Sequence, residues 1–326
     1  MKLSSVFKMI SALMLLTFLT AGCGGPPKQN SQGNSNPGSY LTIKDDLGRS
    51  VTLTKKPEKI VVLSPSFLEL LYAVDGKAVG RPTSAAKIGV DAETLKAIPE
   101  VGFVYNVNVE KVVSLQPDLV IAMQGMHEKL IPILESSKIP VVILKYKTYD
   151  DVFGKIALMG EIAGTQDKAQ ALTQKMRGNL DAVSKKLPNK TTKIAILHAT
   201  AKSVTLELEN SIAGNTAKFL RLQNIAAGSR PIDDGADTAP YSLEKLVEND
   251  PDMIFVVTMG DAAKIEKTMR DDVESNPAWA TLRAVRNKKL VFLPSELFLL
   301  NPGLNTPEAA AYMAKQVYPE IYNHDE

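Results

Sequence analysis

The sequence predicts an α/β fold of two lobes, each a mainly parallel sheet flanked by helices, joined by a long rigid connecting helix. Three observations support this fold class. Short, continuously apolar runs alternate with helical segments, a pattern typical of parallel strands covered on both faces. Residues 149–187 have helical spacing and no strand pattern. A short motif recurs on either side of that helical stretch, which indicates that both lobes contain the same supersecondary piece.

The N-terminal lobe is expected to begin with a small hairpin and to continue as buried strands alternating with helices. Residues 41–53 alternate apolar and polar side chains around Gly48, which predicts the hairpin. Ser64 and Pro65 mark a helix start, because serine caps free amide groups and proline fits the first turn. Continuously apolar runs predict strands at 59–63, 119–122 and 141–144, and a helical segment is expected at 127–137.

The connecting segment and the second lobe follow the same rules. Gly164-Thr165 divides the helical stretch in two, because glycine commonly ends a helix. Strands are expected again at 194–197, 204–208, 254–257 and 290–293. The expected organisation is a signal peptide at 1–22, a lipid-anchored flexible linker at 23–40, an N-terminal lobe at 41–147, a connecting helical segment at 148–190 and a C-terminal lobe at 191–322.

The recurring motif relates residues 108–121 to residues 242–255 at a constant offset. Glu, Lys, Pro and Asp recur at matching positions within the two copies. Each copy reads as a short helix capped by Asn108 or Ser242, a proline that ends the helix, and a buried strand. We therefore expect the two lobes to place these helices in equivalent positions.

The first 22 residues are typical of a secretory signal peptide, because Lys2 and Lys8 precede an apolar run too short to span a bilayer. Small residues stand directly before Cys23, the only cysteine of the chain. This junction resembles the lipobox of bacterial lipoproteins, with Thr20 where that motif usually has leucine. We expect Cys23 to carry a lipid anchor outside the cytoplasm, followed by a flexible tether rich in Gly, Pro, Ser and Asn.

Composition and charge exclude several classes of function. With 44% hydrophobic and 23% charged residues the chain is an ordinary globular protein rather than a disordered or fibrous one. Removing the two lysines of the leader leaves equal numbers of basic and acidic residues and no basic block, so a nucleic-acid partner is not expected. A single cysteine excludes an intramolecular disulfide, and we expect a monomer whose only link to the membrane is the lipid.

The sequence contains no recognisable catalytic motif. It has no nucleophile elbow, no phosphate loop and no pair of histidines at metal-ligand spacing. We therefore expect no catalytic residues, no metal site, no cofactor and no enzymatic turnover. A two-lobed protein outside the cytoplasm indicates instead capture of a small ligand in the cleft between the lobes.

Short motifs are distributed along almost the whole folded chain. They are Asp46–Val51, Pro57–Pro65, Val79–Gly80, Ile98–Gly102, Glu110–Ile121, Tyr241–Ile254, Asn276–Trp279 and Ala284–Val285. Together they resemble the class III substrate-binding lipoproteins of ABC importers for iron-siderophore complexes, haem and vitamin B12. The resemblance implies that the protein captures an iron chelate, a ferric siderophore or haem, and delivers it to a permease dimer with ATPase subunits. A corrinoid-binding protein of the same family, or a sensor lipoprotein without a transport role, are the alternatives.

The resemblance also implies permease-docking residues. One glutamate in each lobe pairs with arginines of the permease in this family, and the matching positions are Glu110 and Glu244. An alternative interpretation is that each is a first-turn acid favoured by the helix dipole. A glutamate stands at this position in both copies of the motif, which favours docking. Helix stability alone does not require the same acid at the same position in both lobes.

Ligand-binding candidates follow the expected strands, because parallel sheets bind ligands at the carboxyl ends of their strands. Arginines suit an anionic siderophore or haem propionates. Tyr, His and Met are ligands of haem iron, and aromatic rings stack on a macrocycle. Packing roles for Met126 and His127 and a hydrogen-bonded core role for His198 are the alternatives. The candidates are Arg81, Tyr105, Met126, His127, His198, Arg230, Tyr241 and Phe298.

Overall fold

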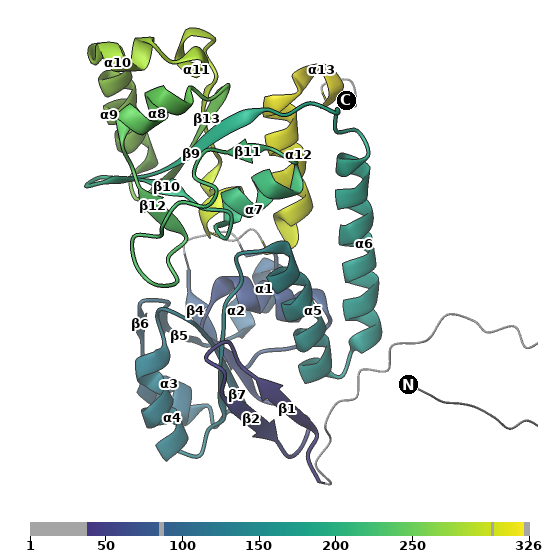
Figure 1. Ribbon diagram of the computed structural model, residues 1–326. Coiled ribbons are helices and arrows are strands. Elements are labelled where there is room, and N and C mark those ends of the chain that lie inside the picture. The colour runs from purple at the N-terminus through teal and green to yellow at the C-terminus, as the bar shows by residue number, and fades with distance from the viewer. Residues whose placement is uncertain (1–37, 85–87, 301–302, 323–326) are drawn as a thin grey trace, which may run out of the picture. The chain divides into compact units, whose positions relative to one another are not determined.

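The computed structural model describes residues 38–84, 88–300 and 303–322, and Figure 1 shows their arrangement. The expected signal peptide, Cys23 and most of the expected linker lie outside the described residues. No helix of the described ranges is long and apolar enough to cross a membrane.

The chain enters the fold through the predicted hairpin of β1 (Leu41–Lys44) and β2 (Ser50–Leu53), which pair antiparallel. Asp45 fixes the turn between them, because its buried carboxylate accepts hydrogen bonds from the Leu47 and Arg49 amides and from the Arg49 guanidinium. The same carboxylate also accepts from the Ile143 amide, 3.3 Å away. The hairpin is thereby attached to the strand that ends the first lobe.

The N-terminal lobe contains the predicted parallel strands in the order β3-β7-β8, and an isolated parallel bridge between Val61 and Gly80 links them to a second small sheet. In that second sheet β4 and β5 are parallel and β6 is antiparallel to β5. Ser64 precedes the first helix, but its side chain makes no capping hydrogen bond. The strands are β3 (Ile60–Val62), β4 (Arg81–Thr83), β5 (Glu100–Phe103), β6 (Asn106–Val107), β7 (Leu119–Met123) and β8 (Val141–Leu144); the helices are α1 (Pro65–Ala73), α2 (Ala92–Ala97), α3 (Val109–Ser114), η1 (Glu128–Leu130) and α4 (Ile131–Ser136).

The connecting segment consists of two helices, α5 (Tyr149–Ala163) and α6 (Gln166–Ser184), and the predicted break between them is confirmed. Gly164 ends α5 in the left-handed region at φ 67°, where glycine is favoured. Thr148 starts α5 with a capping box that it forms with Asp151. In Figure 1, α6 runs alongside both lobes.

The C-terminal lobe has a mixed sheet in the order β12-β10-β9-β13-β14, with β11 paired to β9. β9, β11, β13 and β14 are parallel, whereas at one edge β10 pairs antiparallel with β9 and β12 pairs antiparallel with β10. The strands are β9 (Lys193–Thr200), β10 (Val204–Glu207), β11 (Gln223–Asn224), β12 (Thr238–Pro240), β13 (Met253–Met259) and β14 (Leu290–Phe292); the helices are α7 (Ile212–Phe219), α8 (Leu243–Asn249), α9 (Ala262–Ser275), α10 (Pro277–Ala280), α11 (Arg283–Arg286), η2 (Glu296–Leu300), η3 (Gly303–Asn305), α12 (Thr306–Val317) and α13 (Pro319–Tyr322).

Both main sheets are buried on both faces, as their apolar runs predict. In β3, Val62 belongs to a large central cluster while Val61 faces a second cluster on the other side of the sheet. The central cluster continues through Ile156 of the connecting segment to Ile196 of β9, whereas Ala195 faces a third cluster around Trp279. The two-lobed α/β class is confirmed. The limits expected at 147/148 and 190/191 fall in the links after β8 and after α6, and they stay a prediction.

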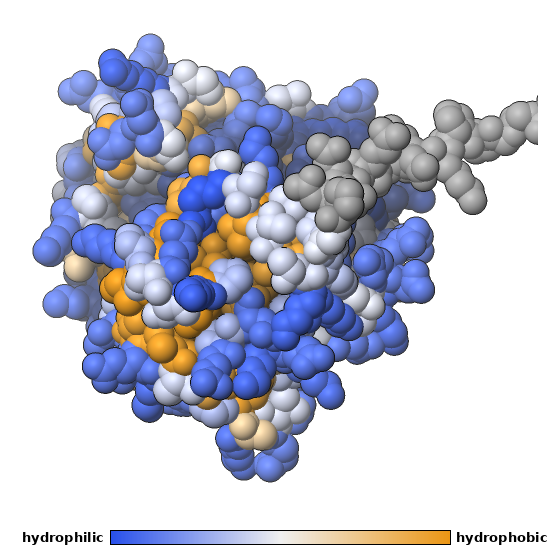
Figure 2. All heavy atoms as spheres, turned by 90° about the horizontal axis from the view of Figure 1, so that it is seen from below, coloured by the Kyte–Doolittle hydropathy of each residue, from blue (hydrophilic) through white to orange (hydrophobic). Residues whose placement is uncertain are grey.

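Apolar side chains also reach the surface. Figure 2 shows hydrophobic residues gathered near the middle and on one side of the face seen from below, among hydrophilic ones. More than half of the accessible surface of an ordinary folded protein is apolar, so such an area alone does not identify a site.

Candidate functional site

The two lobes contact each other where the chain leaves β8 and enters α5. The Lys147 ammonium group forms an ion pair with the carboxylate of Asp237, which lies just before β12. The Tyr149 amide donates a hydrogen bond to Asn215 Oδ1 at 2.9 Å, and the Tyr149 hydroxyl lies 3.3 Å from Thr216 Oγ1. The crossing segment is therefore attached to α7 and to the edge of the second sheet.

A cavity of about 410 Å³ lies at this crossing and is lined by both lobes. Most of its residues follow β7 and β8, so it occupies the carboxyl ends of two parallel strands, where the sequence rule places ligands. Its lining residues are Gln124, Gly125, Lys145, Lys147, Thr148, Asp151, Asn210 and Gly235. None of them was among the candidates from the sequence, although Lys145 and Lys147 directly follow a correctly predicted strand.

The cavity combines positive charge with an unsatisfied polar atom. Lys145 and Lys147 contribute two cations. Burial alone raises the pKa of Asp151, but hydrogen bonds from the Thr148 and Lys147 amides outweigh burial and hold that pKa below its usual range. The Asp151 carboxylate therefore serves to cap the start of α5. The side-chain amide oxygen of Gln124, Oε1, is buried without a hydrogen-bond partner among the described residues.

His198, a candidate from the sequence, lies close to the contact between the lobes. Its Nδ1 atom lies 3.0 Å from Glu207 Oε1 on the neighbouring strand β10. The hydrogen bond with Glu207 raises the pKa of His198, and the nearby Asp237 carboxylate raises it further. Glu207 is only 4% exposed, and its second oxygen, Oε2, has no partner in the described ranges. The imidazolium form is favoured, and it leaves Nε2–H as a second donor.

His127 is buried and bridges two turns of the N-terminal lobe. Its Nε2 atom lies 2.7 Å from the Val104 carbonyl oxygen, and its Nδ1 atom accepts a hydrogen bond from the Met123 amide at 2.9 Å. Burial lowers the pKa of His127. The ring is therefore neutral, with its proton on Nε2, and both nitrogens are used within the protein. This arrangement favours the packing interpretation of His127.

The two turns that His127 joins carry exposed apolar side chains. Tyr105 is 79% exposed and Met126 is 52% exposed, so both sequence candidates are accessible. Phe103, at 45% exposure, stacks on Tyr105 with ring centroids 5.5 Å apart and planes 10° apart.

The other four candidates, like the four above, are not among the residues that line the cavity between the lobes. The Arg81 guanidinium pairs with Glu100 at 2.8 Å and donates to the Leu95 carbonyl oxygen. Arg230 lines a separate pocket of about 390 Å³ on the C-terminal lobe. Burial, with a smaller contribution from the Asp272 carboxylate, raises the pKa of Tyr241 to about 12, because the phenol packs beside the third cluster. Phe298 is 1% exposed and packs edge-on against Tyr312 in the central cluster, which favours a core role.

Glu110 and Glu244 occupy equivalent places in the two lobes. Both are exposed in the first turn of a short helix, and neither forms an ion pair with another described residue. Asn108 Oδ1 accepts from the Lys111 amide at 3.0 Å, and Ser242 Oγ accepts from the Lys245 amide at 3.4 Å. The equivalent capping predicted from the repeat is confirmed.

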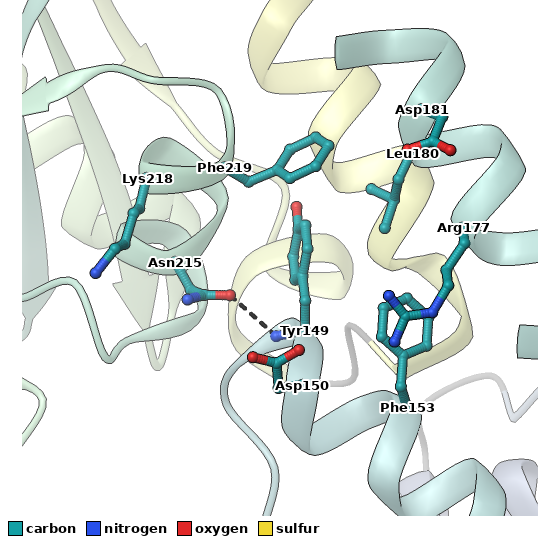
Figure 3. A pocket seen from close by; sticks show the side chains of 9 residues that line it. All are labelled: Tyr149, Asp150, Phe153, Arg177, Leu180, Asp181, Asn215, Lys218 and Phe219. Carbon is teal, nitrogen blue, oxygen red and sulfur yellow. Dashed lines mark hydrogen bonds between the residues drawn. The ribbon is translucent and has the colours of Figure 1, made fainter. Parts of the chain in front are cut away.

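A second cavity of about 390 Å³ lies where the connecting helices meet α7, away from the strand ends (Figure 3). Arg177 lies over the Phe153 ring, 4.2 Å from its centroid. The rings of Tyr149 and Phe219 have centroids 5.2 Å apart. The first contact joins α5 to α6, and the second holds the connecting segment against α7 of the C-terminal lobe. The sequence pattern did not predict either contact.

Two α/β lobes on either side of a cavity, joined by helices, define a bilobal ligand-binding protein. Residues 60–297 match the family model described as "Periplasmic binding protein", and the chain belongs to this family. Among its relatives are binding proteins for iron citrate, siderophores, haem and cobalamin, so it is a class III substrate-binding protein of ABC importers.

Several relatives cover nearly the whole chain. It is 28% identical to the uncharacterized ABC transporter substrate-binding lipoprotein YvrC of Bacillus subtilis, over 96% of this chain and 97% of that protein. It is 25% identical to the Fe(3+)-citrate-binding protein YfmC of the same organism, over 98% of each chain.

Solved structures share the fold. A substrate-binding protein from Listeria monocytogenes matches with a TM-score of 0.71 and 23% identity, over 81% of this chain and 100% of that one. The haem complex of IsdE from S. aureus matches with a TM-score of 0.69 and 19% identity, over 80% and 98% of the two chains.

Proposed function

We propose that this protein is an extracytoplasmic, lipid-anchored receptor that captures an iron chelate, a ferric siderophore or haem, between its lobes and delivers it to an ABC permease. The observation that carries the proposal is the cavity of about 410 Å³ at the carboxyl ends of β7 and β8, lined by both lobes. Binding of iron citrate by a relative of nearly the same length supports the choice of cargo. The receptor has no catalytic turnover of its own, and the chelate is cargo rather than a cofactor.

The charges around the cavity suit an anionic chelate. Lys145 and Lys147 line it, and His198 lies beside the Lys147–Asp237 ion pair with its protonated form favoured. A carboxylate or propionate group of a chelate accepts hydrogen bonds from such cations more strongly than a neutral group does. In this proposal a ligand carboxylate competes with Asp237 for the Lys147 ammonium group, so that binding rearranges the contact between the lobes.

Delivery is proposed to use Glu110 and Glu244 as the docking residues for a permease dimer. Both carboxylates are exposed, they occupy matching positions of the repeat, and no described residue pairs with them. Two equivalent acids on one monomer suit a partner with two-fold symmetry. Cys23, outside the described residues, is proposed as the lipid anchor and residues 23–40 as the linker. The lobes are proposed to span 41–147 and 191–322, with 148–190 between them.

The proposal is tested with the full-length protein purified from membranes in detergent. Haemin, a ferric tris-catecholate, ferric citrate, ferrioxamine B and cyanocobalamin are titrated by calorimetry and by absorbance. Binding of an iron chelate at micromolar or tighter affinity, together with loss of its uptake in a strain lacking the protein, is the expected result. A protein that binds none of the five probes would contradict the proposal. Binding of cyanocobalamin alone would assign the protein to corrinoid uptake.

A further inference from the structure

The cavity of about 390 Å³ where the connecting helices meet α7 combines aromatic rings with unpaired charges. We refer to it as the connector cavity, and Figure 3 labels the nine residues that line it. They come from α5, α6 and α7, so the cavity lies between the connecting segment and the C-terminal lobe. Its volume is within the range of roughly 300–1,000 Å³ that is typical of sites for small molecules.

The connector cavity is distinct from the cavity between the lobes, although one short segment of the chain lines both. Lys147, Thr148 and Asp151 line the cavity between the lobes, whereas Tyr149 and Asp150 line the connector cavity. Among the described residues, none belongs to both linings. A ligand in the connector cavity therefore leaves free the space proposed for the cargo.

One part of the connector cavity is aromatic. The rings of Tyr149 and Phe219 have centroids 5.2 Å apart and planes at 49°, and both side chains are half-buried. Leu180 adds an aliphatic side chain to the lining (Figure 3). Tyr149 is held in place, because its amide donates to Asn215 Oδ1 and its hydroxyl lies 3.3 Å from Thr216 Oγ1. A further ring packs favourably against such a pair in an offset or edge-to-face arrangement.

Arg177 supplies a positive charge that is already positioned. Its guanidinium group lies over the Phe153 ring, 4.2 Å from the ring centroid. Stacking uses the face of the guanidinium group and leaves the N–H donors at its edge available. This group donates a hydrogen bond to no other described residue and forms no ion pair among them. A carboxylate suits the unpaired edge, because two parallel N–H···O hydrogen bonds can form.

Asp150 and Asp181 supply the opposite charge. Both residues are exposed, and neither carboxylate forms an ion pair with another described residue. The other cation of the lining, Lys218, is already paired, because its ammonium group lies 3.1 Å from Glu209 Oε2. A ligand with only a negative charge is repelled by the two carboxylates, and a ligand with only a positive charge leaves Arg177 unpaired. Both signs of charge are therefore expected on one ligand.

We propose that the connector cavity is a second binding site, and that it takes an aromatic α-amino acid in its zwitterionic form. The ring packs against Tyr149 and Phe219. The α-carboxylate accepts hydrogen bonds from Arg177, and the α-ammonium group pairs with the carboxylates of Asp150 and Asp181. An amino acid of this class carries all three features on one small framework. The site goes beyond the proposed function, because it is separate from the space for the cargo.

The test uses one probe with all three features and three probes that each lack one of them. L-phenylalanine has the ring and both charges; hydrocinnamate lacks the ammonium group, phenethylamine lacks the carboxylate, and L-alanine lacks the ring. Each is titrated by calorimetry into the full-length wild-type protein. We expect L-phenylalanine to bind at least roughly tenfold more tightly than each of the other three, because each of them loses one contact.

Charge variants then assign the contacts. Arg177→Gln should lower the affinity for L-phenylalanine about tenfold and leave that for phenethylamine, which has no carboxylate, within about twofold. Asp150→Asn with Asp181→Asn should lower the affinity for L-phenylalanine about tenfold without weakening the binding of hydrocinnamate. The matched control is Arg270→Gln, which removes a second stacked arginine, 4.9 Å from the centroid of Phe292 and outside the connector cavity. It should leave L-phenylalanine binding unchanged, and circular dichroism checks the folding of every variant.

Several outcomes overturn the inference in distinguishable ways. L-phenylalanine binding no tighter than L-alanine rejects the contact with the rings, and tightest binding of hydrocinnamate or phenethylamine rejects a zwitterionic ligand. Binding that is unchanged in Arg177→Gln, or reduced equally in Arg270→Gln, rejects the connector cavity as the site. Failure of all four probes to bind the wild-type protein rejects the inference as a whole. None of these results decides the proposed function, because no iron chelate is used.

Discussion

The imidazole of His127 lies 2.7 Å from the carbonyl oxygen of Val104, and this hydrogen bond joins two turns whose residues are 23 positions apart in the sequence. The other ring nitrogen accepts a hydrogen bond from the Met123 amide, so one buried side chain satisfies the hydrogen-bonding capacity of two backbone groups. The turns it joins carry Tyr105 and Met126 at the surface and continue into the cavity between the lobes. A histidine that the sequence suggested as a ligand of the cargo therefore acts as a support beneath the exposed side chains.

The first prediction concerns this support. His127→Leu leaves the Val104 carbonyl oxygen and the Met123 amide without partners, and each unsatisfied buried group costs about 1–3 kcal/mol. We expect the free energy of unfolding to fall by about 2 kcal/mol or more, measured by urea denaturation. His127→Gln retains an amide donor and an amide oxygen and should recover part of this loss. An unchanged free energy of unfolding in His127→Leu would show that these two hydrogen bonds do not support the fold.

The second prediction concerns pH and His198. The hydrogen bond with Glu207 raises the pKa of His198 above its usual value of 6.5. Because the folded pKa exceeds the unfolded one, this pair stabilises the fold fully below about pH 6.5, and its contribution is lost as the pH rises through the folded pKa. His127 has the opposite sign, since burial lowers its pKa and protonation at low pH destabilises the fold. Histidine proton NMR should show His198 titrating above 6.5 and His127 below it.

Ligand affinity should follow the protonation of His198. Binding of an anionic probe such as haemin or ferric citrate weakens as the pH rises through the folded pKa, because the imidazolium loses its charge. Calorimetry between about pH 6 and 8.5 measures the slope. His198→Gln should flatten it. A slope that persists unchanged in this variant would assign the pH dependence to another group.

Local sequence patterns predicted much of the fold, because a continuous run of apolar residues indicates a strand that is buried on both faces. Ile194, Ala195, Ile196 and Leu197 are all buried, and they alternate between two clusters on opposite faces of one strand. The αL conformation of Gly164 likewise follows from its own lack of a side chain. Such features depend on few distant partners, so the sequence pattern was sufficient for them.

The site was less predictable because its members are set by partners far along the chain. Lys147 and Asp237 are 90 residues apart, and nothing in either segment indicates that they pair. Phe298 follows a predicted strand, but the packing of η2 against α12 places it in the core. The expectation that ligands bind at the carboxyl ends of parallel strands placed the site correctly at that end of the sheet. It did not indicate which of the side chains there line the cavity.

The third prediction concerns the Lys147–Asp237 ion pair, whose two partners should affect the affinity for an anionic ligand in opposite directions. Lys147→Gln removes a cation from the cavity and should lower affinity for ferric citrate or haemin by about threefold to tenfold. Asp237→Asn releases Lys147 from its partner and should raise affinity for the same probes. Both effects should shrink at high salt, because both side chains are partly exposed.

A matched control for this prediction is Lys96→Gln, which removes the lysine of an exposed ion pair with Glu93 on α2. This variant should leave binding unchanged. Equal effects of Lys147→Gln and Lys96→Gln would show that the losses reflect net charge rather than a contact in the cavity.

The fourth prediction concerns the membrane link proposed for Cys23. Cys23→Ser removes the only thiol of the chain and with it the acceptor of a lipid. We expect the protein to move from the membrane fraction to the soluble extracytoplasmic fraction, with its binding affinity for ferric probes unchanged. Continued membrane association of the variant would contradict the anchor.

The final prediction concerns Glu110 and Glu244. Glu110→Ala with Glu244→Ala should leave haemin or ferric tris-catecholate affinity within about twofold, because neither residue lines the cavity. Uptake of radioactive iron from the same probe should be abolished, because the two carboxylates are the proposed partners of permease arginines. Each single variant should retain partial uptake, since one docking contact is still made.

A control variant distinguishes permease docking by Glu110 and Glu244 from a role in which they only interact favourably with the helix dipole. Glu248→Ala removes an exposed acid from α8, the helix that carries Glu244, but near its C-terminal end. If the acids serve only the dipole, the double variant loses a small amount of stability, about 0.3–1 kcal/mol for each residue, and keeps normal uptake. If they dock the permease, uptake fails while stability changes little, and replacing both residues with Gln fails as completely as replacing them with Ala. Uptake unaffected by the double variant would remove the docking assignment and leave ligand capture standing.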